Sequence, residues 1–157
     1  MINCINQLEM EFTMNTNVIT IRQAQPADAT ELQKLNDLFN GAGCNSLENI
    51  ADSLNTNTRE IIFVAADGES LVGFCCAQMF RSMCYPMKYA EITELFVVDR
   101  CRGHGIGRRL LSTMETELME RGARHFHILT SKDNVAAKAL YLSFGFAETT
   151  EIILDKG

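Results

Sequence analysis

A glycine-rich segment between two apolar stretches carries a clear chemical signal. It runs from Asp99 to Leu110 as DRCRGHGIGRRL, with glycines at positions 103, 105 and 107. Glycines let the backbone approach a bound group closely, and the unpaired N–H groups of a helix start point toward that group. The positive end of the helix dipole favours an anion there. The segment therefore predicts a site for a phosphate or pyrophosphate.

The glycine spacing narrows the choice of phosphate ligand. It is not the G-x-G-x-x-G of a dinucleotide site, and no Gly-Lys-Ser/Thr of a P-loop follows. A dinucleotide site also expects an acid after the next strand, where this chain has Thr130, Ser131 and Lys132. Dinucleotide and nucleoside triphosphate binding are both disfavoured. The alternative is a structural turn whose glycines serve packing alone.

Two glutamates form a second group with chemical potential. Glu91 and Glu94 lie in the otherwise apolar stretch from Tyr89 to Val98. Burial there would raise the pKa of a carboxyl group and make it a useful proton acceptor. In a regular strand the two side chains would point to opposite faces. The alternative is that one or both pair with a neighbouring cation such as Lys88.

The elements that must position these residues follow from hydrophobic periodicity and turn signals. A first helix opens at Pro26 and ends before the glycines at 41 and 43, and the whole order is β-α-α-β-β-β-α-β-α-β. This order predicts an α/β sandwich with a mixed, twisted sheet. The expected strands are 18–22, 60–66, 71–80, 89–98, 125–130 and 148–154, and the later helices are 46–54, 105–121 and 134–142.

Length and composition predict one globular domain. The chain has 157 residues, of which 46% are hydrophobic, and its net charge is −6. The acidic balance argues against general nucleic-acid binding, and no apolar run is long enough to span a bilayer. The six cysteines lack metal-ligand spacing, and no secretory leader precedes them. We expect reduced thiols in a cytoplasmic protein, with residues 1–17 as a flexible or docked extension and 18–157 as the domain.

Two segments resemble the Gcn5-related N-acetyltransferase (GNAT) superfamily. Residues 102–107 match its R/Q-x-x-G-x-G/A signature. Residues 134–146 match its N-x-x-A-x-x-L-Y-x-x-x-G-F segment. The resemblance covers about Val18 to Leu154 and implies a GNAT fold, with a sheet of about six to seven strands flanked by about four helices.

The resemblance also implies a cofactor, acetyl-CoA, and its binding residues. In the family the loop amides hold the pyrophosphate, and the preceding strand pairs its backbone with the pantetheine arm. We expect no metal, because His125 and His127 share a strand face without further ligands at a suitable spacing. The implied cofactor residues are Leu95, Phe96, Val97, Arg102, Gly103, His104, Gly105, Ile106, Gly107, Arg108, Asn134 and Tyr141.

Acetyl transfer to an amine needs a proton acceptor, a polarised carbonyl and a proton for the departing thiolate. The family resemblance implies Tyr141 as the general acid, since a phenol is protonated at neutral pH. Glu94 is the favoured base, acting through water, with Glu91 close behind. The β-bulge usual in this family would turn one of these glutamates and free a backbone N–H to polarise the carbonyl.

The favoured function is acetyl transfer from acetyl-CoA by direct attack of a small primary amine, such as an aminoglycoside, polyamine, amino acid or aminoalkyl phosphonate. One alternative is protein or peptide N-acetylation. Another is a regulatory module that binds coenzyme A without catalysis. The chain ends soon after Leu154, which predicts an open sheet edge covered by a second subunit, and hence a homodimer.

Overall fold

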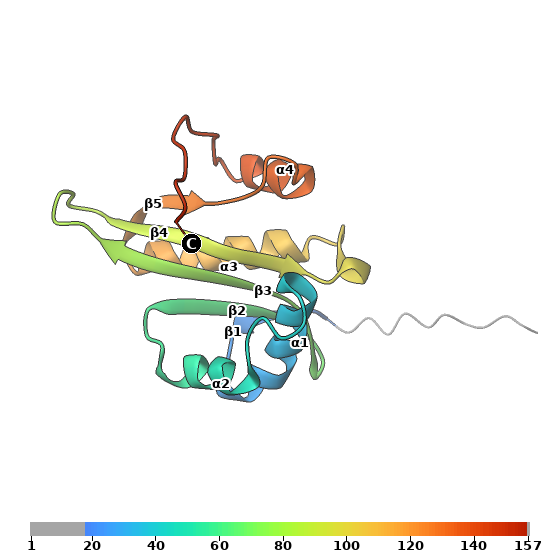
Figure 1. The fold of residues 1–157 in the computed structure, drawn as a ribbon. Coiled ribbons are helices and arrows are strands. Elements are labelled where there is room, and N and C mark those ends of the chain that lie inside the picture. Colours follow the sequence, from blue (N-terminus) through green and yellow to red (C-terminus); the bar gives the residue numbers. More distant parts are fainter. Residues whose placement is uncertain (1–17, 157) are drawn as a thin grey trace, which may run out of the picture.

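In the computed structural model, which describes residues 18–156, five strands form a single sheet in the order β1-β2-β3-β4-β5 (Figure 1). Neighbouring strands are antiparallel except for the last pair, β4 and β5, which is parallel. The sheet is therefore mixed, as predicted. The strands are β1 (Thr20–Gln23), β2 (Glu60–Asp67), β3 (Ser70–Arg81), β4 (Lys88–Val97) and β5 (Ala123–Ile128).

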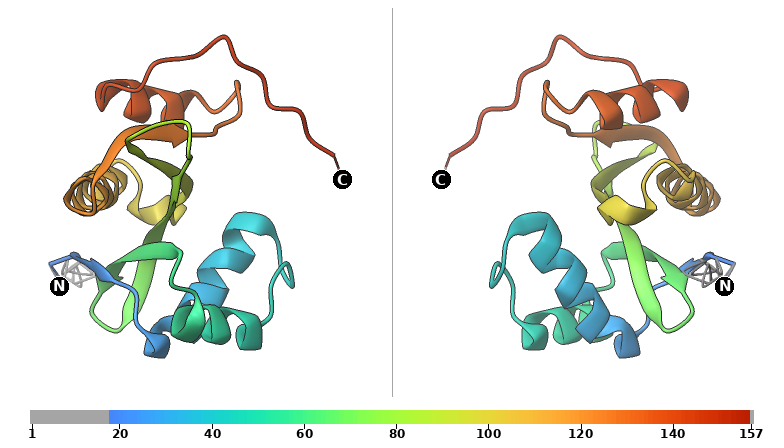
Figure 2. Two further views of the ribbon diagram at one scale, coloured as in Figure 1. Left: turned by 90° about the vertical axis from the view of Figure 1, so that its left-hand side faces the viewer. Right: turned by 90° about the vertical axis from the view of Figure 1, so that its right-hand side faces the viewer.

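Helices cover both faces of this sheet, as Figure 2 shows. One face carries α1 (Ala29–Asn40) and α2 (Leu47–Thr56), and the opposite face carries α3 (Ile106–Glu120). The fourth helix, α4 (Val135–Ser143), follows β5 and lies at that end of the sheet. The four helices confirm the predicted number, and the arrangement is an α/β fold.

The third helix shows how sequence pattern becomes packing. Apolar residues at helical spacing form one buried stripe, and the helix packs on all five strands and closes the core on this side. Gly122, with φ +95°, ends the helix in a conformation that suits glycine. The stripe consists of Ile106, Leu110, Leu111, Met114 and Leu118.

An extra residue, Thr93, interrupts the pairing of β3 with β4. On β3, Cys76 lies opposite Glu94, and the next residue, Ala77, lies opposite Ile92. Thr93 therefore has no partner, which confirms the expected β-bulge. The pairing of β4 with β5 ends at the same place, between Ile92 and Ile128. Within the described residues, the rest of β4 is paired on one edge only.

The predicted last strand, 148–154, is wrong. These residues adopt neither helix nor strand, and the sheet has five strands rather than six or seven. Figure 2 shows this tail leaving α4 and ending on the side of α1 and α2. Ile152 and Leu154 are 78% and 86% exposed. A β-prone sequence forms a strand only where a ladder and a face are available, and the tail has neither.

Two further expectations concern the chain as a whole. The predicted extension, residues 1–17, lies outside the described residues. Within 18–156, no helix is both long enough and apolar enough to cross a membrane.

The close contact of β3 with β4 yields a stability prediction. A Cβ on Gly73 would lie 2.6 Å from the backbone oxygen of Phe96, so Gly73→Ala must push the two strands apart. We expect a loss of about 1–3 kcal/mol in the free energy of unfolding, measured by urea denaturation. Gly107→Ala is the matched control, because a Cβ there meets only ordinary contacts, the nearest at 3.6 Å. Equal stability of the two variants would contradict the strand contact.

Candidate functional site

A cavity of about 220 Å³ lies between the two early helices and the sheet. Its floor comes from strands β2, β3 and β4, and its rim comes from α1, α2 and the loop that joins them. The rim combines four polar residues with three apolar ones, and the floor holds the two glutamates of the cavity. The lining residues are Leu32, Asn36, Asn40, Asn45, Ile50, Ser53, Leu54, Glu60, Ile62, Phe74, Cys76 and Glu94.

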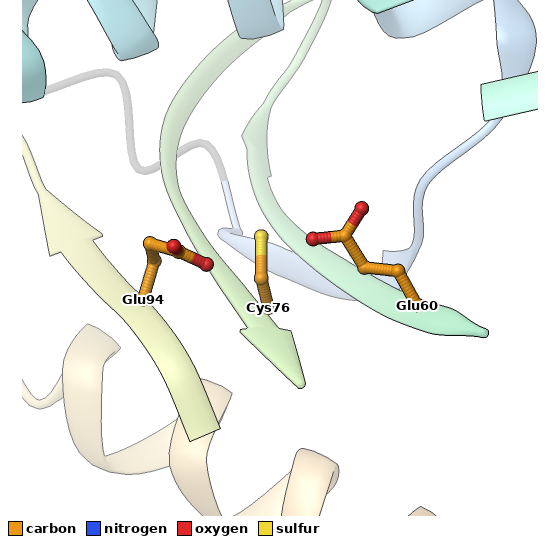
Figure 3. A group of neighbouring side chains, drawn as sticks. All are labelled: Glu60, Cys76 and Glu94. Carbon is orange, nitrogen blue, oxygen red and sulfur yellow. The ribbon is translucent and has the colours of Figure 1, made fainter. Parts of the chain in front are cut away.

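Three ionisable side chains from three adjacent strands meet in this cavity. Figure 3 shows Glu60 of β2 and Glu94 of β4 pointing toward Cys76 of β3, which lies between them. One carboxylate oxygen from each glutamate and the Cys76 sulfur all lie within 4.8 Å of one another. Among residues 18–156 this is the one group of three side chains of the types that ligate metals and that lie close enough to share an ion.

The surroundings of the three groups differ. Thr93 donates a hydrogen bond from its hydroxyl to the Glu94 carboxylate, and Asn57 donates to Glu60 Oε2 at 3.4 Å. Burial, and then the nearby charge of Glu94, raises the pKa of Glu60. Burial also raises the pKa of the Cys76 thiol, which is only 8% exposed. The thiol therefore stays protonated at neutral pH.

The structure separates the two predicted candidates for the base. Because of the bulge, Glu91 lies opposite Gln78 while Glu94 lies opposite Cys76, so both glutamates face the same side of the sheet. In a regular strand they would point to opposite faces. Glu94 lines the cavity, whereas Glu91 is not among the lining residues.

The suggested pairing of a glutamate with Lys88 does not occur within the described residues. Lys88 instead donates from Nζ to the backbone oxygen of Arg121, at 2.7 Å. This contact joins the start of β4 to the end of α3. The cavity therefore takes no positive charge from Lys88.

Tyr141 lies on the other side of the sheet. It is a buried residue of α4, and it borders a second cavity of about 470 Å³ between β5, α4 and the C-terminal tail. Burial, followed by the influence of Cys75, raises the pKa of the Tyr141 phenol. Cys75 neighbours Cys76 in strand β3, so their side chains face opposite sides. Tyr141 and Glu94 thus approach the sheet from opposite faces.

The glycine-rich loop has the open backbone expected of an anion site. Gly103 and Gly105 have φ of +79° and +77°, and no atom lies within 4 Å of a Cβ built on either. Gly105 is also the N-cap of α3, so the free N–H groups of the first turn follow it directly. Ile106 is buried and anchors the helix, while the side chain of His104 is exposed.

Two of the four arginines in this segment are held by neighbours. Arg108 donates to the Ser143 hydroxyl at 2.8 Å, and its guanidinium lies 5.1 Å from the centre of the Phe144 ring. Arg102 forms an ion pair with Asp99 at 3.0 Å. Both arginines are thereby kept beside the glycines, where their charge would favour a phosphate.

The unpaired edge of β4 is the place where a pantetheine arm was expected. Backbone groups of alternate residues point to opposite edges of a strand, so Leu95 and Val97 share an edge that Phe96 does not. Arg102 already donates from Nε to the Val97 oxygen, at 2.9 Å. The backbone of Leu95 faces the same edge within the described part of β4. Leu95 is therefore a better candidate than Val97 for backbone pairing with the pantetheine arm.

Asn134, which was predicted to contact the cofactor, also has a structural role. It is the N-cap of α4, and its Oδ1 accepts a hydrogen bond from the backbone N–H of Ala137 at 3.2 Å. An asparagine three residues before a helical backbone donor is a common capping pattern. The same residue thus fixes the start of the helix that carries Tyr141.

Sequence reasoning missed the polar rim and one carboxylate of the cavity. Glu60 was predicted only as the start of a strand, and the asparagines of α1 and the following loop were assigned no role. Glu60 does carry a local signal, since a carboxylate opens a strand that is otherwise apolar. Its proximity to Glu94 depends on the order of the strands in the sheet, which no local pattern encodes.

Comparison with known families agrees with this architecture. The acetyltransferase (GNAT) family model matches residues 29–146, which include the cavity, the glycine loop and Tyr141. The match spans most of the chain. The chain therefore belongs to the GNAT family and is an acetyltransferase of the GNAT type.

Individual relatives extend the comparison. An uncharacterised N-acetyltransferase of Chlorobaculum tepidum is 34% identical over 70% of this chain and 66% of its own length. An aminoglycoside N(6')-acetyltransferase of Stenotrophomonas maltophilia is 29% identical over 85% of this chain and 90% of its own. The aminoglycoside acetyltransferase AAC(6')-Iy, solved with a bisubstrate analogue of coenzyme A and acetylneamine, has a TM-score of 0.75 and 19% identity over 88% of this chain and 97% of its own.

The two suggested roles of Asn134 can be separated by substitution. We expect Asn134→Ala to lower the free energy of unfolding by about 1 kcal/mol, because the α4 cap is lost. Asn134→Ser keeps a capping oxygen but removes the amide, so it should retain stability in the same urea titration. If Asn134→Ala is as stable as Asn134→Ser, the cap contributes nothing. A raised KM for acetyl-CoA in the serine variant would assign the amide to the cofactor.

Proposed function

We propose that this protein transfers an acetyl group from acetyl-CoA to the primary amine of a small molecule. The observation that carries the proposal is the bulge at Thr93. It sets Glu94 in the cavity between the sheet and the two early helices, and it coincides with the end of the β4–β5 pairing. An acceptor cavity on one face and an unpaired strand edge next to it are what a two-substrate transfer requires.

Binding of acetyl-CoA is supported by three features of the chain. The loop glycines are open, the helix α3 begins directly behind them, and two arginines lie beside them. These features match the chemistry of a pyrophosphate. A structural neighbour, AAC(6')-Iy, was solved with a coenzyme A conjugate, which is consistent with this assignment.

The proposed reaction begins with loss of a proton from the bound ammonium to Glu94, directly or through water. The free amine then attacks the thioester carbonyl, and a backbone N–H released by the bulge stabilises the developing oxyanion. The C–S bond breaks as the amide forms. Tyr141 protonates the departing thiolate, and the second proton of the attacking nitrogen replaces the one that Tyr141 gave. Overall, an ammonium and acetyl-CoA yield an amide, coenzyme A and one proton.

The positions of the two proposed proton carriers suit this sequence. Glu94 borders the acceptor cavity on the α1 and α2 side, and Tyr141 approaches from the side of α4. Beyond Ile92 and Ile128, β4 and β5 cease to pair, which leaves a gap in the hydrogen-bond ladder between these two side chains' regions. A thioester held in that gap would have the attacking amine on one side and the acid on the other.

A panel of acceptors tests the proposal directly. The full chain is incubated with acetyl-CoA and aminoglycosides, polyamines, amino acids, aminoalkyl phosphonates or peptides, and thiol release is followed spectrophotometrically. Turnover with a small amine is expected. Tight binding of coenzyme A without turnover on any member would contradict the enzyme assignment, and turnover with peptides alone would contradict the acceptor class.

Substituting each glutamate in turn distinguishes the candidates for the base. With the best amine of the panel, we expect Glu94→Gln to lower kcat/KM by about 100-fold or more, since a positioned base contributes on that order. Glu91→Gln is the matched variant, with the same change of charge on the same strand. We expect its kcat/KM to stay within a few-fold of the wild type. The reverse result would assign the base to Glu91.

The raised pKa of Tyr141 gives a prediction about pH. A raised pKa keeps the phenol protonated to a higher pH than an ordinary tyrosine, so the proton-donor form persists across neutral and mildly alkaline solution. We therefore expect no alkaline loss of kcat from this residue below about pH 10. Tyr141→Phe should lower kcat by about 100-fold with little change in either KM. An unchanged kcat in this variant would remove Tyr141 as the acid.

A further inference from the structure

The two cavity carboxylates have no compensating cation among the residues that the structure describes. Within residues 18–156, neither Glu60 nor Glu94 takes part in an ion pair. The residues that line the cavity include no lysine, arginine or histidine. Two partly buried negative charges this close repel each other, and their separation from water makes the repulsion stronger. A cationic ligand placed between them would relieve it.

The separation of the carboxylates, at most 4.8 Å between one oxygen of each, is short enough for one ammonium group to reach both. Two hydrogen bonds of about 2.8 Å that leave a tetrahedral nitrogen place their acceptor oxygens about 4.6 Å apart. The nearest oxygens of Glu60 and Glu94 lie within 4.8 Å of each other. A primary ammonium can thus donate to both carboxylates together and keep a third N–H for water or for the proton transfer.

We propose that Glu60 binds the acceptor amine jointly with Glu94 and selects acceptors that enter as a primary ammonium. This inference rests on the proposed acetyl transfer and names a residue that neither motif of the chain contains. Glu94 takes the proton, and the Glu60 carboxylate holds the nitrogen in place as the proton leaves. Without Glu60, the amine would be held by a single carboxylate and would have more freedom to turn away.

The rest of the lining defines the class of acceptor further. Asn36 and Asn40 of α1, Asn45 of the following loop and Ser53 of α2 place uncharged donors and acceptors around the rim. Such groups suit hydroxyl or additional amino groups on the acceptor. A cavity of about 220 Å³ admits one ring or a short chain. The acceptor is therefore a primary alkyl amine bearing neighbouring hydroxyl or amino groups, as in an amino sugar.

A metal ion is the other cation that this group could hold. Zinc takes thiolate and carboxylate ligands, and the Cys76 sulfur lies with the two carboxylates. Binding through sulfur releases the Cys76 proton, and burial raises the pKa of this thiol, which makes that release more costly. The two carboxylates remain available to an ammonium without any such deprotonation. The ammonium is therefore the cation that this arrangement favours.

A pair of isosteric variants tests the role of Glu60. Glu60→Gln removes the cavity charge, and Glu69→Gln is the control, since it removes the same charge from the exposed turn between β2 and β3. With the best amine of the panel, we expect Glu60→Gln to raise the KM for the amine about 10-fold or more, with the KM for acetyl-CoA unchanged. Glu69→Gln should match the wild type in both constants.

The pH dependence supplies a readout that a purely structural role would not change. The titratable groups that face Glu60 are Cys76 and Glu94. The side chains that line the cavity from α1 and α2 carry no charge. Because the pKa of Glu60 is raised, its carboxylate is lost as the pH falls through that value, and the KM for the amine should rise. This rise in the KM for the amine at low pH should be weaker in Glu60→Gln. Urea denaturation reports whether the variant is folded.

The outcomes separate this inference from the proposed function. If the wild type turns over no amine, acetyl transfer to small amines fails. If the wild type is active but Glu60→Gln behaves as Glu69→Gln does, only the role of Glu60 fails. If zinc copurifies at about one ion per chain and Cys76→Ser releases it, the group is a metal site and the ammonium assignment is overturned.

Discussion

The single unpaired residue Thr93 is the constraint on which the site depends. Without it, the side chain of Glu94 would point to the face opposite that of Glu91, and the cavity would lose its second carboxylate. The bulge lies where β5 stops pairing, so the same residue marks the start of the open strand edge. A bulge disrupts the ladder locally and bends the strand. Here one irregularity prepares both the acceptor side and the proposed cofactor side of the reaction.

The protein has a net charge of −6, but its acidic and basic groups lie in different regions. Partly buried carboxylates border the cavity between α1, α2 and the sheet, while arginines and helix N–H groups surround the glycine loop. The two proposed substrates have opposite charges, since an amine enters as a cation and coenzyme A carries phosphates. Local fields act over a few ångströms, so each region can attract its own substrate despite the overall acidity.

Local patterns predicted the elements better than they predicted the site. The glycine loop, the helix stripe of α3 and the alternating strands were recognisable because each depends on neighbours in sequence. The tail at 148–154 was predicted as a strand from its composition, but a strand exists only where a ladder forms, and Ile152 remains mostly exposed. Glu60 could not be connected with Glu94, because strand order in a sheet is a long-range property. Where a single residue shifts the register, as Thr93 does, face assignments by simple alternation are wrong.

The adjacent cysteines of β3 show how consecutive residues serve opposite sides of the reaction. Cys75 lies on the side of Tyr141, and Cys76 lies between the cavity carboxylates. A thiolate in either place would compete with the amine for the thioester, because the thiolate is the stronger nucleophile at neutral pH. Burial raises the pKa of both thiols and keeps them protonated. In the proposed reaction, the burial of these two thiols would thus protect the acetyl group from the protein's own sulfur.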